Sequence, residues 1–193
     1  MTDIESFKAD LIDRTTKPTN LRPFVCEGSP LECQAFIVGF NPATEMSGNF
    51  WDFWRAGYGF DKARWLAEYV EERKRRPLRP GKTRRPTMSP TRRVIEWVVD
   101  GASPVHVLET NLHAVATAMA RELGEDQQDT NSLEFLIEKI NPQVIVAHGK
   151  EAMAYIHGRY PDIRVIPVDH FSRGWSQVSA RALGQQIRDA CGM

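Results

Sequence analysis

The chain has 193 residues, of which 41% are hydrophobic and 26% charged, and its 25 basic and 25 acidic residues cancel. This composition is typical of one globular domain and excludes a disordered chain. No apolar run approaches the roughly 20 residues that a membrane helix needs, and the polar start MTDIESFKAD is not typical of a signal peptide. We therefore expect a cytoplasmic protein.

The cysteines exclude two further classes of protein. Cys26, Cys33 and Cys191 are odd in number, scattered and without a CxxC pair. This pattern argues against a disulfide framework and against a four-cysteine metal or iron–sulfur site. We expect no metal and no cofactor.

Hydrophobic periodicity predicts short apolar strands that alternate with helices. In chain order the expected elements are a helix over 4–13, a strand over 35–40, a helix over 61–75, a helix from 90, a strand over 104–108, a helix from 131 or 132 to 140, a strand over 143–147, a helix over about 149–158, a strand over 164–168 and a helix over 176–190. Residues 20–33 lack such a pattern and are expected to be irregular. Continuous apolar runs such as Ala35 to Phe40 are typical of strands buried on both faces. The order predicts a single three-layer α/β domain over residues 1–193, with a mostly parallel four-stranded sheet and helices on both faces.

Basic residues gather in one stretch of a chain that is neutral overall. Ten fall within residues 73–93 with no acid among them: Arg73, Lys74, Arg75, Arg76, Arg79, Lys82, Arg84, Arg85, Arg92 and Arg93. Four prolines and Gly81 interrupt the stretch, so we expect a mobile basic loop. One interpretation is a solvated loop. The other is an arm that contacts phosphates, because lysine and arginine release counterions from nucleic acid; Arg84, Arg85, Arg92 and Arg93 are then the expected DNA contacts.

A polar side chain follows each predicted strand. Asn41 comes after the first strand, Asn111 after the second, His148 after the third and His170 after the fourth. Ligands of open α/β sheets bind beyond the carboxyl ends of the strands. Each of these residues alone would be an ordinary turn or cap residue, but four together favour a site at this edge of the sheet.

These segments, in this order, resemble the motifs of the uracil-DNA glycosylase superfamily. The run from Phe36 to Ala43 is similar to its first motif, a buried strand ending in Gly-x-Asn/Asp-Pro, in the variant of the mismatch-specific and single-strand-selective branches. Residues 105–115 resemble the second motif, 144–149 the third strand with its glycine turn, and 169–175 a His-led loop that presses into DNA. The resemblance covers about residues 35–175 and implies that family's fold.

The resemblance also implies a function and a set of site residues. The function is a monofunctional, metal-independent DNA glycosylase of base-excision repair, acting on uracil or a related damaged or mispaired base flipped out of single- or double-stranded DNA; we expect a monomer. Asn41, whose amide oxygen orients a water, and His170, which donates to the departing base, are the expected catalytic residues. The expected base-binding residues are Gly39, Phe40, Ala43, Phe50, which stacks on the base, and Asn111, which reads its edge. Ser172 and Arg173 are expected to contact DNA.

Departures from the family pattern keep alternatives open. The family's usual His-Pro-Ser is here His170-Phe171-Ser172, and an amide at Asn41 does not accept a proton at neutral pH. Both departures fit a catalytically silent nucleic-acid binder of the same fold. Ala43 lacks the bulky aromatic ring that excludes thymine in the strictly uracil-specific branch, so we expect a pocket that accepts 5-substituted bases.

Two unrelated enzyme classes are less compatible with the sequence. A nucleotide-binding fold predicts a glycine-rich phosphate loop after the first strand, and the loop over 41–49 offers only Gly48. A metallohydrolase would draw its ligands from Glu109, His113, Asp169 and His170. These four residues contain no compact HExxH-like pair.

Overall fold

The computed structural model describes residues 3–15, 21–44, 46–78, 80–81, 83–117 and 120–193. Its main feature is a five-stranded mixed, mostly parallel sheet with the strand order β1-β5-β2-β6-β7. The strands are β1 (Phe24–Val25), β2 (Ala35–Gly39), β5 (Val107–Asn111), β6 (Val144–His148) and β7 (Arg164–Val168). β1 runs antiparallel to β5, whereas the other neighbours are parallel. A separate two-stranded sheet pairs β3 (Trp54–Arg55) with β4 (Gly59–Phe60).

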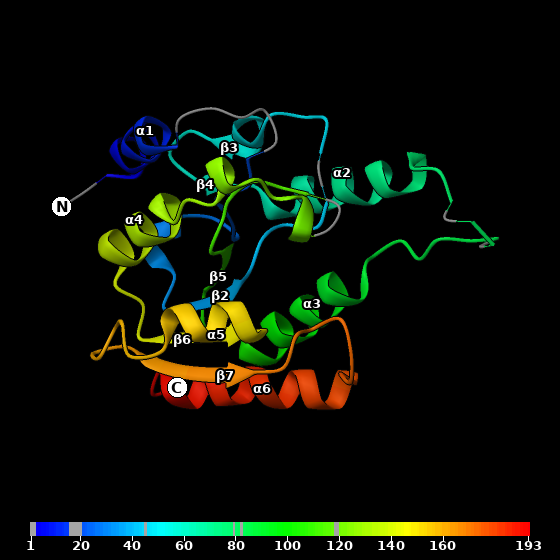
Figure 1. The fold of residues 1–193 in the computed structure, drawn as a ribbon. Helices are drawn as coiled ribbons and strands as arrows, with labels where there is room; N and C mark the ends of the chain where they lie inside the picture. The colour runs from blue at the N-terminus through cyan, green and yellow to red at the C-terminus, as the bar shows by residue number, and fades with distance from the viewer. Residues whose placement is uncertain (1–2, 16–20, 45, 79, 82, 118–119) are drawn as a thin grey trace.

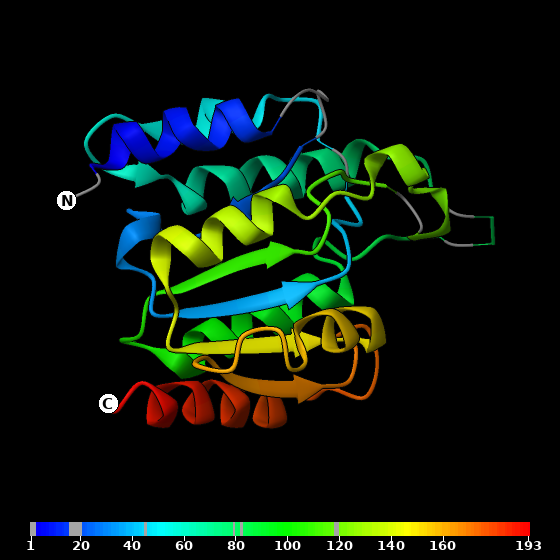
Figure 2. The same cartoon turned by 60° about the vertical axis from the view of Figure 1, so that its left-hand side comes forward.

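Helices cover both faces of the sheet (Figures 1 and 2). The six α-helices are α1 (Ile4–Arg14), α2 (Lys62–Arg75), α3 (Pro90–Ala102), α4 (Asn131–Ile140), α5 (Lys150–Ile156) and α6 (Gln177–Ala190). Along β2, Phe36 and Val38 pack into a core shared with α1, α2, α4 and α5, while Ala35 and Ile37 pack against α3 and α6. This alternation follows from the two-residue period of a strand. None of the described helices is both long and apolar enough to cross a bilayer.

The expected α/β class and the alternation of strands and helices are confirmed, but the sheet has five strands instead of four. Residues 20–33, expected to be irregular, contain β1. β1 is two residues long, which is too short to produce a periodic pattern. The strand expected over 104–108 is β5 and covers 107–111, because Val105 belongs to a turn in which its N–H donates to the carbonyl of Ala102. Asn111 is therefore the last residue of the strand.

The basic stretch is partly helical. α2 continues to Arg75 and α3 begins at Pro90, so only the connection between them lies outside regular structure. The described part of this connection projects from the body of the domain (Figures 1 and 2). Arg79 and Lys82 lie outside the described residues.

Candidate active site

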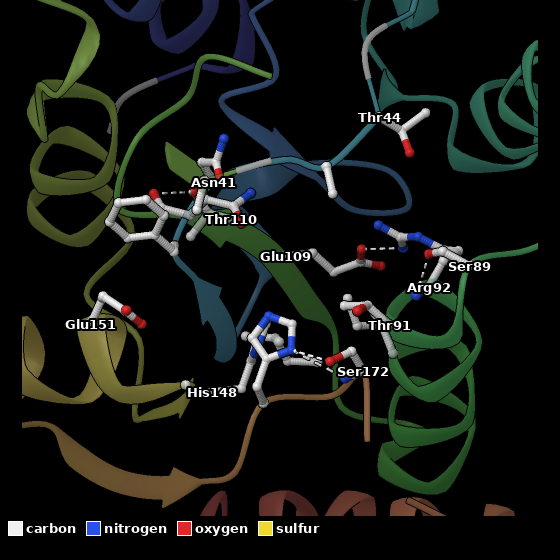
Figure 3. Close-up of a pocket in the computed structure, with 18 of the residues that line it drawn as sticks. Asn41, Thr44, Ser89, Thr91, Arg92, Glu109, Thr110, His148, Glu151 and Ser172 are labelled. Atoms are coloured by element: carbon white, nitrogen blue, oxygen red, sulfur yellow. Dashed lines mark hydrogen bonds and ion pairs between the residues drawn. The ribbon is translucent and has the colours of Figure 1, made fainter. Parts of the chain in front are cut away.

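A cavity of about 790 Å³ opens at the carboxyl ends of β2, β5, β6 and β7. Asn41, Asn111, His148 and His170, the polar residues predicted from the strand ends, all line it. Further parts of the wall come from the first turn of α3 and from the loop after β7. Figure 3 shows Asn41, Glu109, His148 and Ser172 around one open space. The sheet thus brings together side chains from four separate segments of the chain.

Asn111 and His148 line the cavity from the strands on either side of Gly39, and the three residues form one row of the sheet. Gly39 pairs in register with Asn111, and Val38 pairs with Ala147, so His148 follows on the other side of Gly39. Side chains in one row of a parallel sheet point to the same face. A Cβ on Gly39 would lie 2.6 Å from His148 Nε2 and 2.9 Å from Asn111 Oδ1. Because Gly39 has no side chain, the Asn111 amide and the His148 imidazole can both occupy the space above its Cα.

Two hydrogen bonds donated by its amide group hold the Asn41 side chain in place. Its Nδ2 donates to Thr117 Oγ1 at 2.7 Å and to the carbonyl of Val115 at 3.4 Å. Both hydrogen bonds use the NH₂ end, which leaves the amide oxygen as the acceptor at the cavity. An acceptor held in this way can orient a water molecule but cannot take its proton.

His170 is held as a neutral imidazole by Ser172. The backbone N–H of Ser172 donates to His170 Nδ1 at 3.2 Å, and Ser172 Oγ lies 2.9 Å from the same nitrogen. Because Nδ1 accepts, the ring proton is on Nε2. Burial lowers the pKa of His170; the Glu151 carboxylate opposes this shift and Arg173 adds to it. At neutral pH the ring therefore offers the cavity one N–H donor and no net charge.

His148 is a second neutral imidazole, and it is only 5% exposed. Its ring stacks on Phe171, with centroids 4.4 Å apart and an interplanar angle of 14°. Burial, followed by repulsion from His170, lowers the pKa of His148 to about 3. Among the described residues Nδ1 has no hydrogen-bond partner, so the ring proton is better placed on Nε2, the nitrogen beside Gly39.

The pKa of His148 predicts a stability loss in mild acid. The unfolded chain binds a proton near the ordinary histidine pKa of about 6.5, whereas the folded protein does not until about pH 3. Stability should therefore be constant above that ordinary pKa and should fall below it by about 1 kcal/mol per pH unit. Urea unfolding at about pH 7 and about pH 5 measures this. His148→Leu should flatten the slope, and the exposed His106→Gln should not; an unchanged slope in His148→Leu contradicts the assignment.

A buried cluster of charges forms another wall. Glu109 accepts hydrogen bonds from Arg92 Nη1 and from Lys62 Nζ, the latter at 2.8 Å. Glu96 pairs with the same two cations, at 2.9 Å from Arg92 and 3.1 Å from Lys62. Burial opposes the charge on Glu109, but Arg92 and Lys62 outweigh it and lower the pKa of this carboxyl. The carboxylate is therefore ionised and faces the cavity beside Arg92 (Figure 3).

No known protein family matches the sequence, and no curated protein is similar to it.

Most of the residues expected at the site line the cavity, and five of them differ from the expectation. Phe40, Asn41, Ala43, Asn111, His170, Ser172 and Arg173 are at its wall, and Gly39 lies beneath the Asn111 and His148 side chains that line it. Phe50 is 6% exposed and stacks on Phe60 in the core, away from the cavity. Arg92 lines the cavity but is buried and ion-paired, unlike an exposed phosphate contact. Arg84 and Arg93 are exposed and do not line the cavity, and Arg85 donates to the carbonyl of Pro77.

Sequence reasoning missed several residues of the wall. Arg22, Tyr69, Ser89 and Thr91 line the cavity, and Glu109 was considered only as a metal ligand. A glutamate inside an apolar strand is a signal for a buried ion pair, whereas nothing around Arg22 marks it. No three His, Cys, Asp or Glu side chains of the described ranges form a group that could hold a metal ion. His113 instead hydrogen-bonds through Nδ1 to the carbonyl of Asp129 at 3.0 Å.

Proposed function

We propose that this protein is a DNA glycosylase that binds an extrahelical base in the strand-end cavity and hydrolyses its N-glycosidic bond. The observation that carries the proposal is that one cavity holds three groups of complementary chemistry. They are a fixed amide oxygen on Asn41, a neutral N–H donor on His170 and an amide on Asn111. The order of motifs from Gly39 to His170, which resembles that of uracil-DNA glycosylases, supports the same assignment.

These groups match the charges of the reaction. When the bond between sugar and base breaks, negative charge collects on the base and positive charge on the sugar. His170 Nε2–H donates to an oxygen of the departing base and stabilises the negative charge that collects there. Asn111 distinguishes the base edge by its one acceptor and two donors.

Asn41 orients the water whose oxygen bonds to C1′ of the sugar as the bond to the base breaks. The proton of this water goes to the departing base or to solvent, because the Asn41 amide does not accept it. The reaction then depends on a sugar cation that is already well developed, so turnover is slow unless the base is a good leaving group. Ala43 leaves room beside the base, which favours uracil analogues with a substituent at carbon 5.

A catalytically silent nucleic-acid binder is the second candidate. It is favoured by the state of one carboxylate at the cavity: Glu109 is ion-paired with Arg92 and Lys62 and is poorly placed to act as a free general base. The same cavity would then recognise an extrahelical base without releasing it.

The deciding experiment is a cleavage assay on labelled oligonucleotides that contain uracil, 5-hydroxymethyluracil, hypoxanthine or a G·T mismatch. Asn41→Ala should reduce abasic-site formation by about 100-fold, the usual scale for removing one positioned catalytic group. Asn131→Ala, at an exposed position of α4, is the matched control and should retain full activity. Cleavage of uracil alone would contradict the expected tolerance of 5-substituents.

The alternatives give different results in the same assay. Salt-sensitive DNA binding without cleavage by the wild-type protein would favour the silent binder. Neither cleavage nor binding would reject both candidates.

A further inference from the structure

The charge cluster at the cavity wall contains one cation more than it can pair. Lys62 and Arg92 are matched by Glu96 and Glu109. Arg22 is a further cation at the same wall. Its guanidinium has no ion pair and no hydrogen bond with any residue that the structure describes; its backbone N–H alone is bonded, to the carbonyl of Ala114. Arg22 is partly buried at the cavity, so its guanidinium is available to an anion that enters there.

Arg22 and Arg92 lie against the same aromatic ring. Their guanidinium carbons are 5.5 Å and 4.9 Å from the centroid of Trp65. The indole attracts each cation, but it does not remove the repulsion between them. Burial, and next the charge of Arg92, lowers the pKa of Arg22 to about 10. Glu109 acts in the opposite direction, and Arg22 remains a cation at neutral pH.

The donors around Arg22 are suited to an anion. Arg92 directs Nη1 at both of its carboxylates, which leaves its Nε and Nη2 groups as further donors. Thr91 lies in the first turn of α3, a helix of 13 residues, and lines the cavity beside Ser89, which caps the N–H of Arg92. Backbone N–H groups in a first helical turn carry partial positive charge and bind anions.

We propose that the cavity binds an oxyanion, a phosphate or a carboxylate group of its ligand, at Arg22 and Arg92, which both line it. The proposal stands apart from base excision, because it concerns binding at a different wall of the cavity from Asn41 and Asn111. The planar guanidinium groups of Arg22 and Arg92 each offer paired N–H donors, and carboxylate and phosphate oxygens accept this arrangement best. Bound there, the anion supplies the counter-charge that the protein lacks.

Calorimetric titration with small probes tests the site without cleavage. The probes are inorganic phosphate, deoxyuridine monophosphate, 5-carboxyuracil and their neutral counterparts deoxyuridine and uracil. We expect at least one anionic probe to bind at least tenfold more weakly to Arg22→Met than to the wild type, and the neutral probes to bind both proteins equally. Preference for the monophosphate assigns the oxyanion to a nucleotide phosphate, and preference for 5-carboxyuracil assigns it to a carboxylate on the base.

The melting temperature separates a binding role of Arg22 from a structural one. In phosphate-free buffer Arg22→Met should melt at the same temperature as the wild type or higher, because the substitution removes an unpaired charge. An anionic probe should then raise the melting temperature of the wild type and of the control Arg93→Met, but not that of Arg22→Met. A lower melting temperature of Arg22→Met without ligand, equal anion binding by both proteins, or no binding of any anionic probe would overturn the proposal.

Discussion

Replacing Arg92 with methionine is expected to lower the free energy of unfolding by about 3–5 kcal/mol, the usual cost of removing one partner of a buried ion pair. The side chains of Arg92 and Glu109 are 6% and 5% exposed. Without Arg92, the Glu109 carboxylate stays buried with Lys62 as its remaining cation. Urea unfolding of the wild type and Arg92→Met near neutral pH measures the loss.

Two variants make this result specific to the buried pair. Arg93→Met removes an exposed neighbouring cation on the same helix and should change stability by less than about 0.5 kcal/mol. Adding Glu109→Gln to Arg92→Met removes the uncompensated charge and should recover part of the loss. If Arg92→Met is as stable as Arg93→Met, the cluster does not hold this wall of the cavity in place.

Gly39→Ala is expected to reduce base excision by about 10²–10³-fold, the scale of losing a positioned group in the transition state. The new methyl group would lie 2.6 Å from His148 Nε2 and 2.9 Å from Asn111 Oδ1. His148 cannot easily yield, because Phe171 stacks on its ring. Overpacking of this kind typically also costs about 1–3 kcal/mol of stability. Single-turnover cleavage and urea unfolding report the two effects separately.

Gly48→Ala is the matched control, since a Cβ there meets no atom within 4 Å. It should change neither cleavage nor stability. The double variant Gly39→Ala with His148→Ala restores space on one side of the row and should recover stability in part. Full activity in Gly39→Ala would show that the positions of Asn111 and His148 beside Gly39 do not matter for the proposed reaction.

The positions of the catalytic candidates could be predicted because they depend on sheet topology. Parallel strands with apolar runs align their carboxyl ends, so the residues after them converge on one edge whatever their separation in the chain. Asn41 and His170 are 129 residues apart in the sequence and line the same cavity. Local chain patterns are sufficient for this inference.

The charged wall could not be predicted in the same way. Arg22 precedes a strand of two residues, and Arg92 was assigned to a basic loop from composition. The helix predicted from residue 90 does place Arg92 in its first turn, but nothing in the sequence shows that this turn faces Glu109 across the cavity wall. Phe50 was misplaced for a related reason: aromatic spacing does not distinguish a ring that faces a ligand from one that packs on Phe60 in the core.

The buried side chain of Phe171 anchors the loop that carries His170. Phe171 is fully buried, stacked on His148 and in edge contact with Trp175, with ring centroids 5.0 Å apart. A loop held at its centre in this way loses little conformational entropy when a ligand arrives. Arg173 and Gly174 are exposed in the same loop, so under the proposed function binding would not have to wait for the loop to become ordered.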